Sequence, residues 1–268
     1  MLPLRMIGLK TEMRRLQDGG LAWLQWPLLA GFPEVEHRIW TRHGGVSPAP
    51  YETLNLGYGV GDAPAHVQEN RSRVRQAMGL AELISVGQIH GSNTLILTDR
   101  QTVAQGREVQ GVDILITNLP GVGLLIKQAD CQAVVLYDPE QRVIANVHCG
   151  WRGNVHNVLG QAVGRLQEVF GSRPAALLAG ISPSLGPCCA EFKNFRREMP
   201  AEFWGYQVRP TYFDLWRLSV EQLLAAGLVR EHIQVAGLCS RCQAKDFYSY
   251  RRDGVTGRNG TVVALRQR

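Results

Sequence analysis

The stretch VDILITNLPGVGLLIKQADCQAVVLYDPEQRVIANV (residues 112–147) holds four short apolar runs separated by turn-forming Asn, Pro, Gly and Asp residues. Short runs of this composition predict strands rather than helices, because β-branched side chains fit the pleated surface of a sheet. The four predicted strands cover residues 112–117, 122–128, 133–137 and 143–147. A sheet-rich centre is therefore expected to decide the fold.

Further β-rich runs and helical repeats extend outward from this centre. Strands are also predicted at residues 37–42, 84–89, 94–98, 175–181, 232–238 and 261–265. Helices are predicted at residues 62–78, 155–170 and 214–226, where apolar residues recur at helical spacing and a Gly follows the last turn. Asp62 is expected to cap the first helix. Because strands and helices do not alternate strictly, the predicted fold class is α+β.

A chain of 268 residues can form one large domain or two small ones. No linker-like tract or repeat divides it, so we expect one domain over residues 1–268. The N-terminus lacks an apolar segment followed by a cleavage site, and the longest apolar run, residues 21–32, is too short to span a bilayer. A cytoplasmic protein with no membrane partner is expected, and its six Cys residues are expected to be reduced thiols.

The formal charge of +6 raises the question of nucleic-acid binding. The basic residues are scattered along the chain, and no basic stripe interleaved with aromatic residues is present. Nucleic acid is therefore not an expected partner. Arg is much commoner than Lys, and its guanidinium matches phosphate and carboxylate well, although a general composition bias explains most of this excess.

Three residues far apart in the chain have the side chains that zinc prefers. They are His90 in GQIHGSN, Cys131 in KQADCQAVVL and His148 in ANVHCGWRG. One thiolate and two imidazoles leave a fourth tetrahedral position open, as in a catalytic rather than a structural zinc site. All three residues lie at predicted strand ends. Each of them alone is more commonly a buried or hydrogen-bonded residue than a ligand.

Other sequence motifs indicate a function less strongly than the His90, Cys131 and His148 triad does. Gly57, Gly59 and Gly61 miss the spacing of a dinucleotide-binding loop. The H-x-E with P-C-x-x-C signature of cytidine-type deaminases and the H-E-x-x-H signature are absent from the sequence. Cys239 and Cys242 form a C-x-x-C pair, and a structural zinc shared with Cys188 and Cys189 is one alternative, although adjacent cysteines are a poor second half of such a site.

The order and spacing of several motifs resemble a known family. These motifs are TRHGGVS, YETLNLGYGVGD, VGQIHGSNT, KQADCQAVVLYD, ANVHCGWRGNV, GISPSLGPCCAEF and FYSYRRDGVTGRNG. Together they resemble the YfiH-type family, whose members are named multicopper polyphenol oxidoreductase (laccase), purine nucleoside phosphorylase or peptidoglycan editing factor. The resemblance covers roughly residues 36–266. It implies a YfiH-like α+β sandwich of mixed β-sheets flanked by helices.

The resemblance also implies a zinc site and an activity. In this family the corresponding residues bind zinc, which carries over to His90, Cys131 and His148 as metal-binding and catalytic residues. Similar proteins cleave adenosine, inosine, guanosine and methylthioadenosine with phosphate and deaminate adenosine, so purine nucleosides and phosphate are the expected partners. The family has Ala where this chain has Cys149, which leaves open whether this second thiol distorts or supplements the ligand set.

Four further residues are candidates for substrate binding. Arg42 and Arg152 are suited to orienting phosphate, and Asn55 and Gln88 to hydrogen bonding with substrate or with ligand imidazoles. Purely structural roles remain open for all four, since buried polar side chains commonly satisfy backbone groups.

Two other classes of function remain open. The first is a copper-dependent polyphenol oxidase, because copper binds His and Cys more tightly than zinc does. A single triad, however, has few ligands for a multicopper centre. The second is a metal-free cysteine hydrolase with Cys131 as nucleophile and His148 as base, or a peptidoglycan-precursor editing factor.

Overall fold

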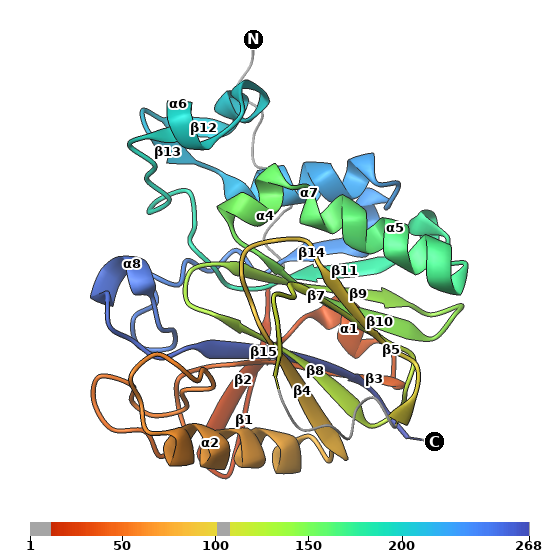
Figure 1. The fold of residues 1–268 in the computed structure, drawn as a ribbon, viewed down its shortest axis with the longest axis vertical. Coiled ribbons are helices and arrows are strands. Elements are labelled where there is room, and N and C mark those ends of the chain that lie inside the picture. Colours follow the sequence, from red (N-terminus) through yellow and green to blue (C-terminus); the bar gives the residue numbers. More distant parts are fainter. Residues whose placement is uncertain (1–11, 101–107, 268) are drawn as a thin grey trace.

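Two mixed β-sheets form the centre of the protein (Figure 1). The computed structural model describes residues 12–100 and 108–267. The expectation that the chain has no export signal rests partly on residues 1–11, which lie outside the described residues. Within the described residues, one sheet has the strand order β1 (Arg14–Asp18), β2 (Leu21–Gln25), β3 (Val35–Trp40), β15 (Asn259–Leu265), β8 (Val122–Gln128), β4 (Glu82–Gly87), β6 (Val109–Gln110). The other has the order β14 (Ile233–Val235), β11 (Leu178–Ile181), β9 (Gln132–Asp138), β10 (Val143–Cys149), β7 (Ile114–Thr117), β5 (Thr94–Leu97).

The two sheets pack face to face, and the alternation of side chains along β9 shows why both faces are apolar. Val135 and Tyr137 pack with Ile126 of the neighbouring sheet, whereas Val134 and Leu136 pack on the opposite face. Since side chains alternate across a strand, a strand buried on both faces needs a continuous apolar run. The run AVVLY meets this requirement.

Helices cover the outer faces of the two sheets (Figure 1). Helix α2 (Pro64–Ala77) lies on the seven-stranded sheet, where Val74 packs against Leu125. Helices α4 (Trp151–Val155), α5 (Val158–Phe170) and α7 (Leu215–Ala225) lie over the six-stranded sheet. Shorter elements are α1 (Pro27–Ala30), α6 (Phe195–Glu198), α8 (Tyr250–Asp253) and a small hairpin of β12 (Gln207–Arg209) and β13 (Tyr212–Phe213). The result is a sandwich flanked by helices.

The predicted α+β class is confirmed, with local differences. Helix α2 begins at Pro64 with Ala63 at its N-cap, so Asp62 is not the capping residue. The Asp62 carboxylate accepts a hydrogen bond from the Ala63 N–H and lies 3.0 Å from the His66 Nδ1 in the first helical turn. The helix predicted at residues 155–170 is interrupted after α4, because Asn157 adopts a left-handed backbone conformation and starts α5. Strands β1 and β2 were not predicted.

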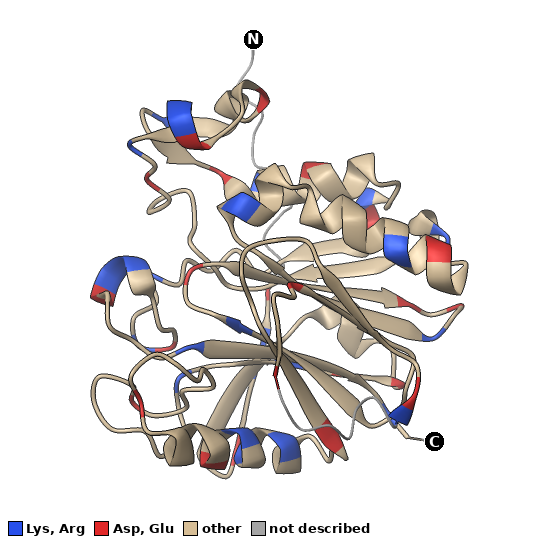
Figure 2. Cartoon of the chain, viewed as in Figure 1, with Lys and Arg blue, Asp and Glu red and all other residues tan. Residues whose placement is uncertain are grey.

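Basic side chains are distributed over the molecule. Figure 2 shows Lys and Arg on α2, α5, α6 and α8, with no single element collecting them. Among the described residues, no helix is both long enough and apolar enough to cross a bilayer.

Candidate metal centre and cavity

The side chains of His90, Cys131 and His148 meet at one end of the six-stranded sheet. Cys131 directly precedes β9, and His148 of β10 pairs with Ala133 of β9. His90 lies in the loop that follows β4. The three possible ligand atoms lie within 4.8 Å of one another, so the fold brings together three residues that the sequence separates widely.

The distances within this triad fit a mononuclear metal site. The Cys131 Sγ lies 3.7 Å from the His90 Nε2, and a tetrahedral zinc with ordinary Zn–S and Zn–N bonds would separate these atoms by about 3.6 Å. The imidazole rings of His90 and His148 lie edge to face with centroids 4.8 Å apart. One thiolate and two imidazoles are a donor set that suits zinc and copper alike.

Asp113 orients two of the three residues. Its carboxylate lies 2.7 Å from the His148 Nδ1, which leaves the Nε2 of that ring free for a metal. The same carboxylate accepts hydrogen bonds from the backbone N–H groups of His90 and Gly91, at 3.0 and 2.8 Å. A carboxylate behind a ligand imidazole is a common partner of metal sites, because it sets the ring orientation and raises the basicity of the ligand.

Burial and neighbouring charges act in opposite directions on the two buried ligands. Burial raises the pKa of Cys131, but the positive charge of His148 and hydrogen bonds from both imidazoles outweigh it and lower the pKa to about 6. Burial lowers the pKa of His148, but the Cys131 thiolate and Asp113 raise it to about 9. The site therefore favours a Cys131 thiolate beside a positive charge. A divalent cation can supply this charge, as a proton on His148 does.

Unusual backbone geometry supports the triad. His90 and Asp130 have φ of 64° and 89°, in the left-handed region that non-glycine residues rarely occupy. Asp130 is held there by hydrogen bonds to its carboxylate from the Ser240 hydroxyl, at 2.7 Å, and the Arg251 N–H, at 2.6 Å. A Cβ at Gly150 would lie 2.8 Å from the Cys131 Sγ, so only glycine permits this approach.

The triad opens onto a cavity of about 780 Å³, within the usual size of small-molecule sites. Four basic residues, Lys127, Arg152, Arg251 and Arg258, line this cavity together with the triad. The Lys127 ammonium is bound by Glu108, at 3.0 Å, and by a backbone carbonyl. Arg258 is half-buried, and burial lowers its pKa although the charges of Cys131 and Asp130 oppose this.

Of the four predicted substrate-binding residues, two line the cavity and two lie outside its lining. Gln88 and Arg152 line the cavity, but both ends of the Gln88 amide bind the Lys127 backbone, at 2.8 and 2.9 Å. Arg42 does not line it, because its guanidinium binds the Glu52 carboxylate and backbone carbonyls and stacks over the Tyr248 ring. Asn55 is fully buried outside the lining, where its side chain holds the Gly57 and Arg258 backbone.

Cys149 is directed away from the triad. It follows His148 on β10, so its side chain lies on the opposite face of the sheet, where it is 1% exposed and packs with the α5 core. Burial raises the pKa of this thiol above its usual range. Cys149 is therefore a core residue rather than a fourth ligand.

Two residues of this site were not found from the sequence. Asp113 is the second residue of the strand predicted at residues 112–117, and an acidic residue within an otherwise mostly apolar run was the available signal. Arg258 belongs to the TGR segment of the last family motif. Neither position reveals its spatial partners, because the site is assembled from segments that are distant in sequence, among them the loop of His90, the strand of His148 and the segment of Arg258.

The fold and the triad define a class of α+β sandwich proteins with a His/Cys group that could hold a metal ion. A family described as multi-copper polyphenol oxidoreductase laccase matches residues 36–266, and the chain belongs to this family. The resemblance to YfiH-type proteins is thereby confirmed.

Named relatives and solved structures agree with this membership. The purine nucleoside phosphorylase of Deinococcus radiodurans is 36% identical over 261 residues, which cover 93% of this chain and 95% of the relative. Purine nucleoside phosphorylase YlmD of Geobacillus stearothermophilus is 34% identical over 243 residues, which cover 85% and 89%. The crystal structure of YlmD from Geobacillus stearothermophilus has a TM-score of 0.84 at 30% identity, covering 94% of this chain and 99% of that one.

Proposed function

We propose that this chain is a zinc-dependent purine nucleoside phosphorylase. Adenosine, inosine, guanosine and methylthioadenosine are the proposed substrates, with deamination of adenosine as a second activity. The observation that carries the proposal is the His90, Cys131 and His148 triad at the wall of an arginine-lined cavity. The names of the relatives support it.

The donor set fits zinc, and the three residues would be its ligands. A zinc ion held there would act as a Lewis acid toward phosphate or water. Asp113 keeps the Nδ1 side of His148 occupied, so the imidazole presents its other nitrogen. Asp130 and Gly150 hold the Cys131 thiolate close to His90.

Arginines in the cavity are suited to hold phosphate. Arg152 is exposed, with its guanidinium 4.4 Å over the Trp151 ring, which leaves its edge available to an anion. Arg258 is half-buried in the lining, and its Nη1 donates to the backbone carbonyls of residues 256 and 257, at 2.9 and 3.0 Å, which fixes the guanidinium at the cavity wall. An ion pair with an anion there is stronger than in water. Both would orient phosphate toward the ribose, and their charge would offset that of the departing purine.

Aromatic residues of the cavity are suited to hold the purine. Tyr250 lines the cavity and is nevertheless 61% exposed. Trp151 and Phe192 line it as well, with their rings 6.1 Å apart. Stacking of a base on an exposed aromatic ring is favourable for any purine, which is consistent with several nucleosides as substrates.

Phosphate titration tests this proposal. Inosine or adenosine is expected to yield ribose 1-phosphate and free base only with phosphate present, as measured by HPLC. Arg258→Ala or Arg152→Ala should raise the phosphate KM by roughly 10- to 150-fold, because a lost charge-assisted hydrogen bond costs about 1.5–3 kcal/mol. Inosine formed from adenosine would report the deaminase activity.

Arg42→Ala is the matched control for these two variants. Its guanidinium is bound to Glu52 and backbone carbonyls outside the cavity, so this variant should lower the melting temperature and leave the phosphate KM unchanged. Release of base without phosphate would instead indicate a hydrolase.

A copper-dependent polyphenol oxidase is the second candidate, favoured by the family description and by the two-His, one-Cys donor set. Metal analysis of protein purified without chelator separates the two candidates. We expect zinc in the triad. Several copper ions per chain, with an intense thiolate-to-copper absorption band and oxidation of a phenol, would support the oxidase.

A further inference from the structure

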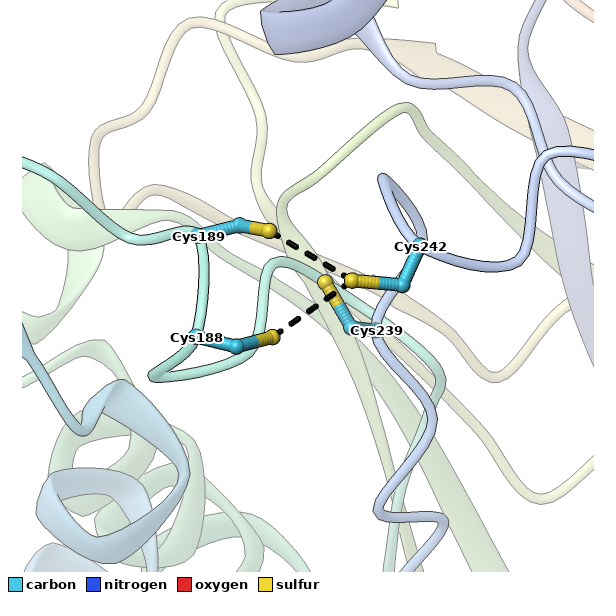
Figure 3. Close-up of side chains that lie close together, drawn as sticks. All are labelled: Cys188, Cys189, Cys239 and Cys242. Atoms are coloured by element: carbon cyan, nitrogen blue, oxygen red, sulfur yellow. Dashed lines mark hydrogen bonds between the residues drawn. The ribbon is translucent and has the colours of Figure 1, made fainter.

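A second group of thiols lies outside the cavity. The Sγ atoms of Cys188, Cys189, Cys239 and Cys242 all lie within 4.8 Å of one another (Figure 3). The Cys242 sulfur is 3.6 Å from that of Cys188 and 3.5 Å from that of Cys189. A disulfide would bring two sulfurs to about 2.05 Å, whereas four thiolates around a tetrahedral zinc would lie about 3.8 Å apart. The observed spacing matches the second arrangement.

Local geometry explains how adjacent cysteines reach one centre. In a strand, neighbouring side chains point to opposite faces, but Cys188 and Cys189 lie in a turn closed by a 2.8 Å hydrogen bond from the Cys189 N–H to the Gly186 carbonyl. Pro187 occupies the second position of this turn, where its fixed φ is favourable. Both thiols therefore point toward Cys242, as Figure 3 shows.

The other two cysteines come from a C-x-x-C turn. The Gln243 N–H donates to the Cys239 carbonyl at 2.9 Å, which folds residues 239–243 into a single turn. Cys239 also forms a parallel bridge with Ser184, so the two segments lie side by side. C-x-x-C is a common half of structural zinc sites.

We propose that these four cysteines bind a structural zinc ion. Four thiolates fill the tetrahedral shell, unlike the triad, which leaves one position open. Sulfurs this close enclose a single ion rather than a multi-iron cluster. The Arg241 guanidinium, 3.6 Å from the Cys189 Sγ, would offset part of the negative charge of such a centre.

This ion would stabilise the wall of the cavity. Ser240, between the two C-x-x-C cysteines, donates its hydroxyl to Asp130, the residue before Cys131. On the other segment, the Leu185 N–H donates to the Asp130 carbonyl at 2.8 Å. A metal that ties the two segments together thus supports the strained residue that positions a triad ligand.

Zinc stoichiometry tests the proposal independently of any enzymatic activity. The chain, purified under reducing conditions and reconstituted with zinc, should hold two equivalents by mass spectrometry of its metal content. The double variant Cys239→Ser/Cys242→Ser should hold one, His90→Ala should also hold one, and Cys149→Ala should hold two. A double variant Cys239→Ser/Cys242→Ser that holds as much zinc as the wild-type chain, or iron in place of zinc at the four cysteines, would overturn the proposal.

Thiol reactivity provides a readout that needs no variant. Cys188 and Cys242 are exposed, so as free thiols both would be accessible to a chromogenic disulfide reagent. With zinc bound, both should react slowly, and a chelator should make them react fast. Equally fast reaction with and without zinc, or a disulfide among the four cysteines in the reduced preparation, would contradict a metal site.

Discussion

Gly150 controls how closely two proposed ligands approach each other. Its backbone has φ −83°, which any residue can adopt, so the constraint is steric. A Cβ there would lie 2.8 Å from the Cys131 Sγ and 3.0 Å from His90 Cδ2. Gly150→Ala is therefore expected to weaken zinc binding by at least about tenfold, measured by competition with a chromophoric chelator.

Gly164 provides the control for this prediction. It lies in α5, and a Cβ added there would meet no heavy atom within 4 Å. Gly164→Ala should leave zinc affinity unchanged and raise the free energy of unfolding by up to about 1 kcal/mol, as in other helices. Equal zinc affinity in the two variants would show that the close approach at Gly150 is unimportant.

Asp113→Asn tests the residue behind the triad. The carboxylate accepts from His148 and from the backbone N–H groups of residues 89, 90 and 91, and an amide would place a donor against one of these donors. Zinc affinity should fall by about 10- to 100-fold, in the same competition assay. Asp138→Asn, a buried carboxylate that binds only backbone N–H groups of a turn, should reduce stability without this effect.

Residue chemistry could be inferred from the sequence better than side-chain direction could. His90, Cys131 and His148 were recognised by their donor types and lie together. Arg42 and Asn55 have suitable chemistry and occur in family motifs, yet their side chains bind backbone and carboxylate partners. The direction of a side chain depends on contacts between segments that are distant in sequence, and a single sequence does not reveal these contacts.

At the level of elements, the strongest predictions came from strands buried on both faces. The runs around β8, β9 and β10 are mostly apolar and almost entirely buried, and their boundaries agree with the structure within two residues. The β1–β2 hairpin was missed although Gly19 and Gly20 both have positive φ and join the paired Asp18 and Leu21. A two-glycine turn between strands was the available signal, but β1 is fully exposed and carries no apolar pattern.

The break between α4 and α5 also depends on one residue. Asn157 has φ 50°, and its side chain accepts a hydrogen bond from the Gly160 N–H. Asn157→Ala removes this cap and places alanine in a left-handed conformation, so the free energy of unfolding should fall by about 2 kcal/mol. Urea denaturation would measure the loss.

Asn157→Gly separates the two contributions, because glycine tolerates the conformation but cannot form the cap. Asn157→Gly should lower the free energy of unfolding by less than Asn157→Ala does. An alanine variant as stable as the wild type would show that α4 and α5 can join into one helix.

At the scale of the whole molecule, the four-layer arrangement depends on contacts that local patterns do not encode. Trp26 follows β2, yet its indole N–H donates to the Ile181 carbonyl in the other sheet, at 3.2 Å. A Cβ at Gly180 would lie 2.6 Å from the Trp26 ring. Such pairings between distant segments explain why the class of fold could be predicted from the sequence but not the order of strands in either sheet.

His37 makes this bridge between the sheets sensitive to pH. Its Nε2 accepts a hydrogen bond from the Trp26 N–H at 3.0 Å, which requires a neutral ring. Burial lowers the pKa of His37 to about 4, and the charge of Arg266 acts in the same direction. In the unfolded chain the imidazole takes up a proton near pH 6.5. The unfolded state therefore gains protons first as the pH falls, and the folded state loses relative stability.

The free energy of unfolding should consequently fall by up to about 1.4 kcal/mol per pH unit from His37 between about pH 6.5 and about pH 4, with no further loss below. His37→Gln can still accept from Trp26 but cannot be protonated, so it should show a shallower decline. Urea denaturation of both proteins across this range measures the difference, and the contributions of metal sites and other groups cancel in the comparison. Parallel profiles for the two proteins would mean that His37 is protonated as readily in the folded chain as in the unfolded one.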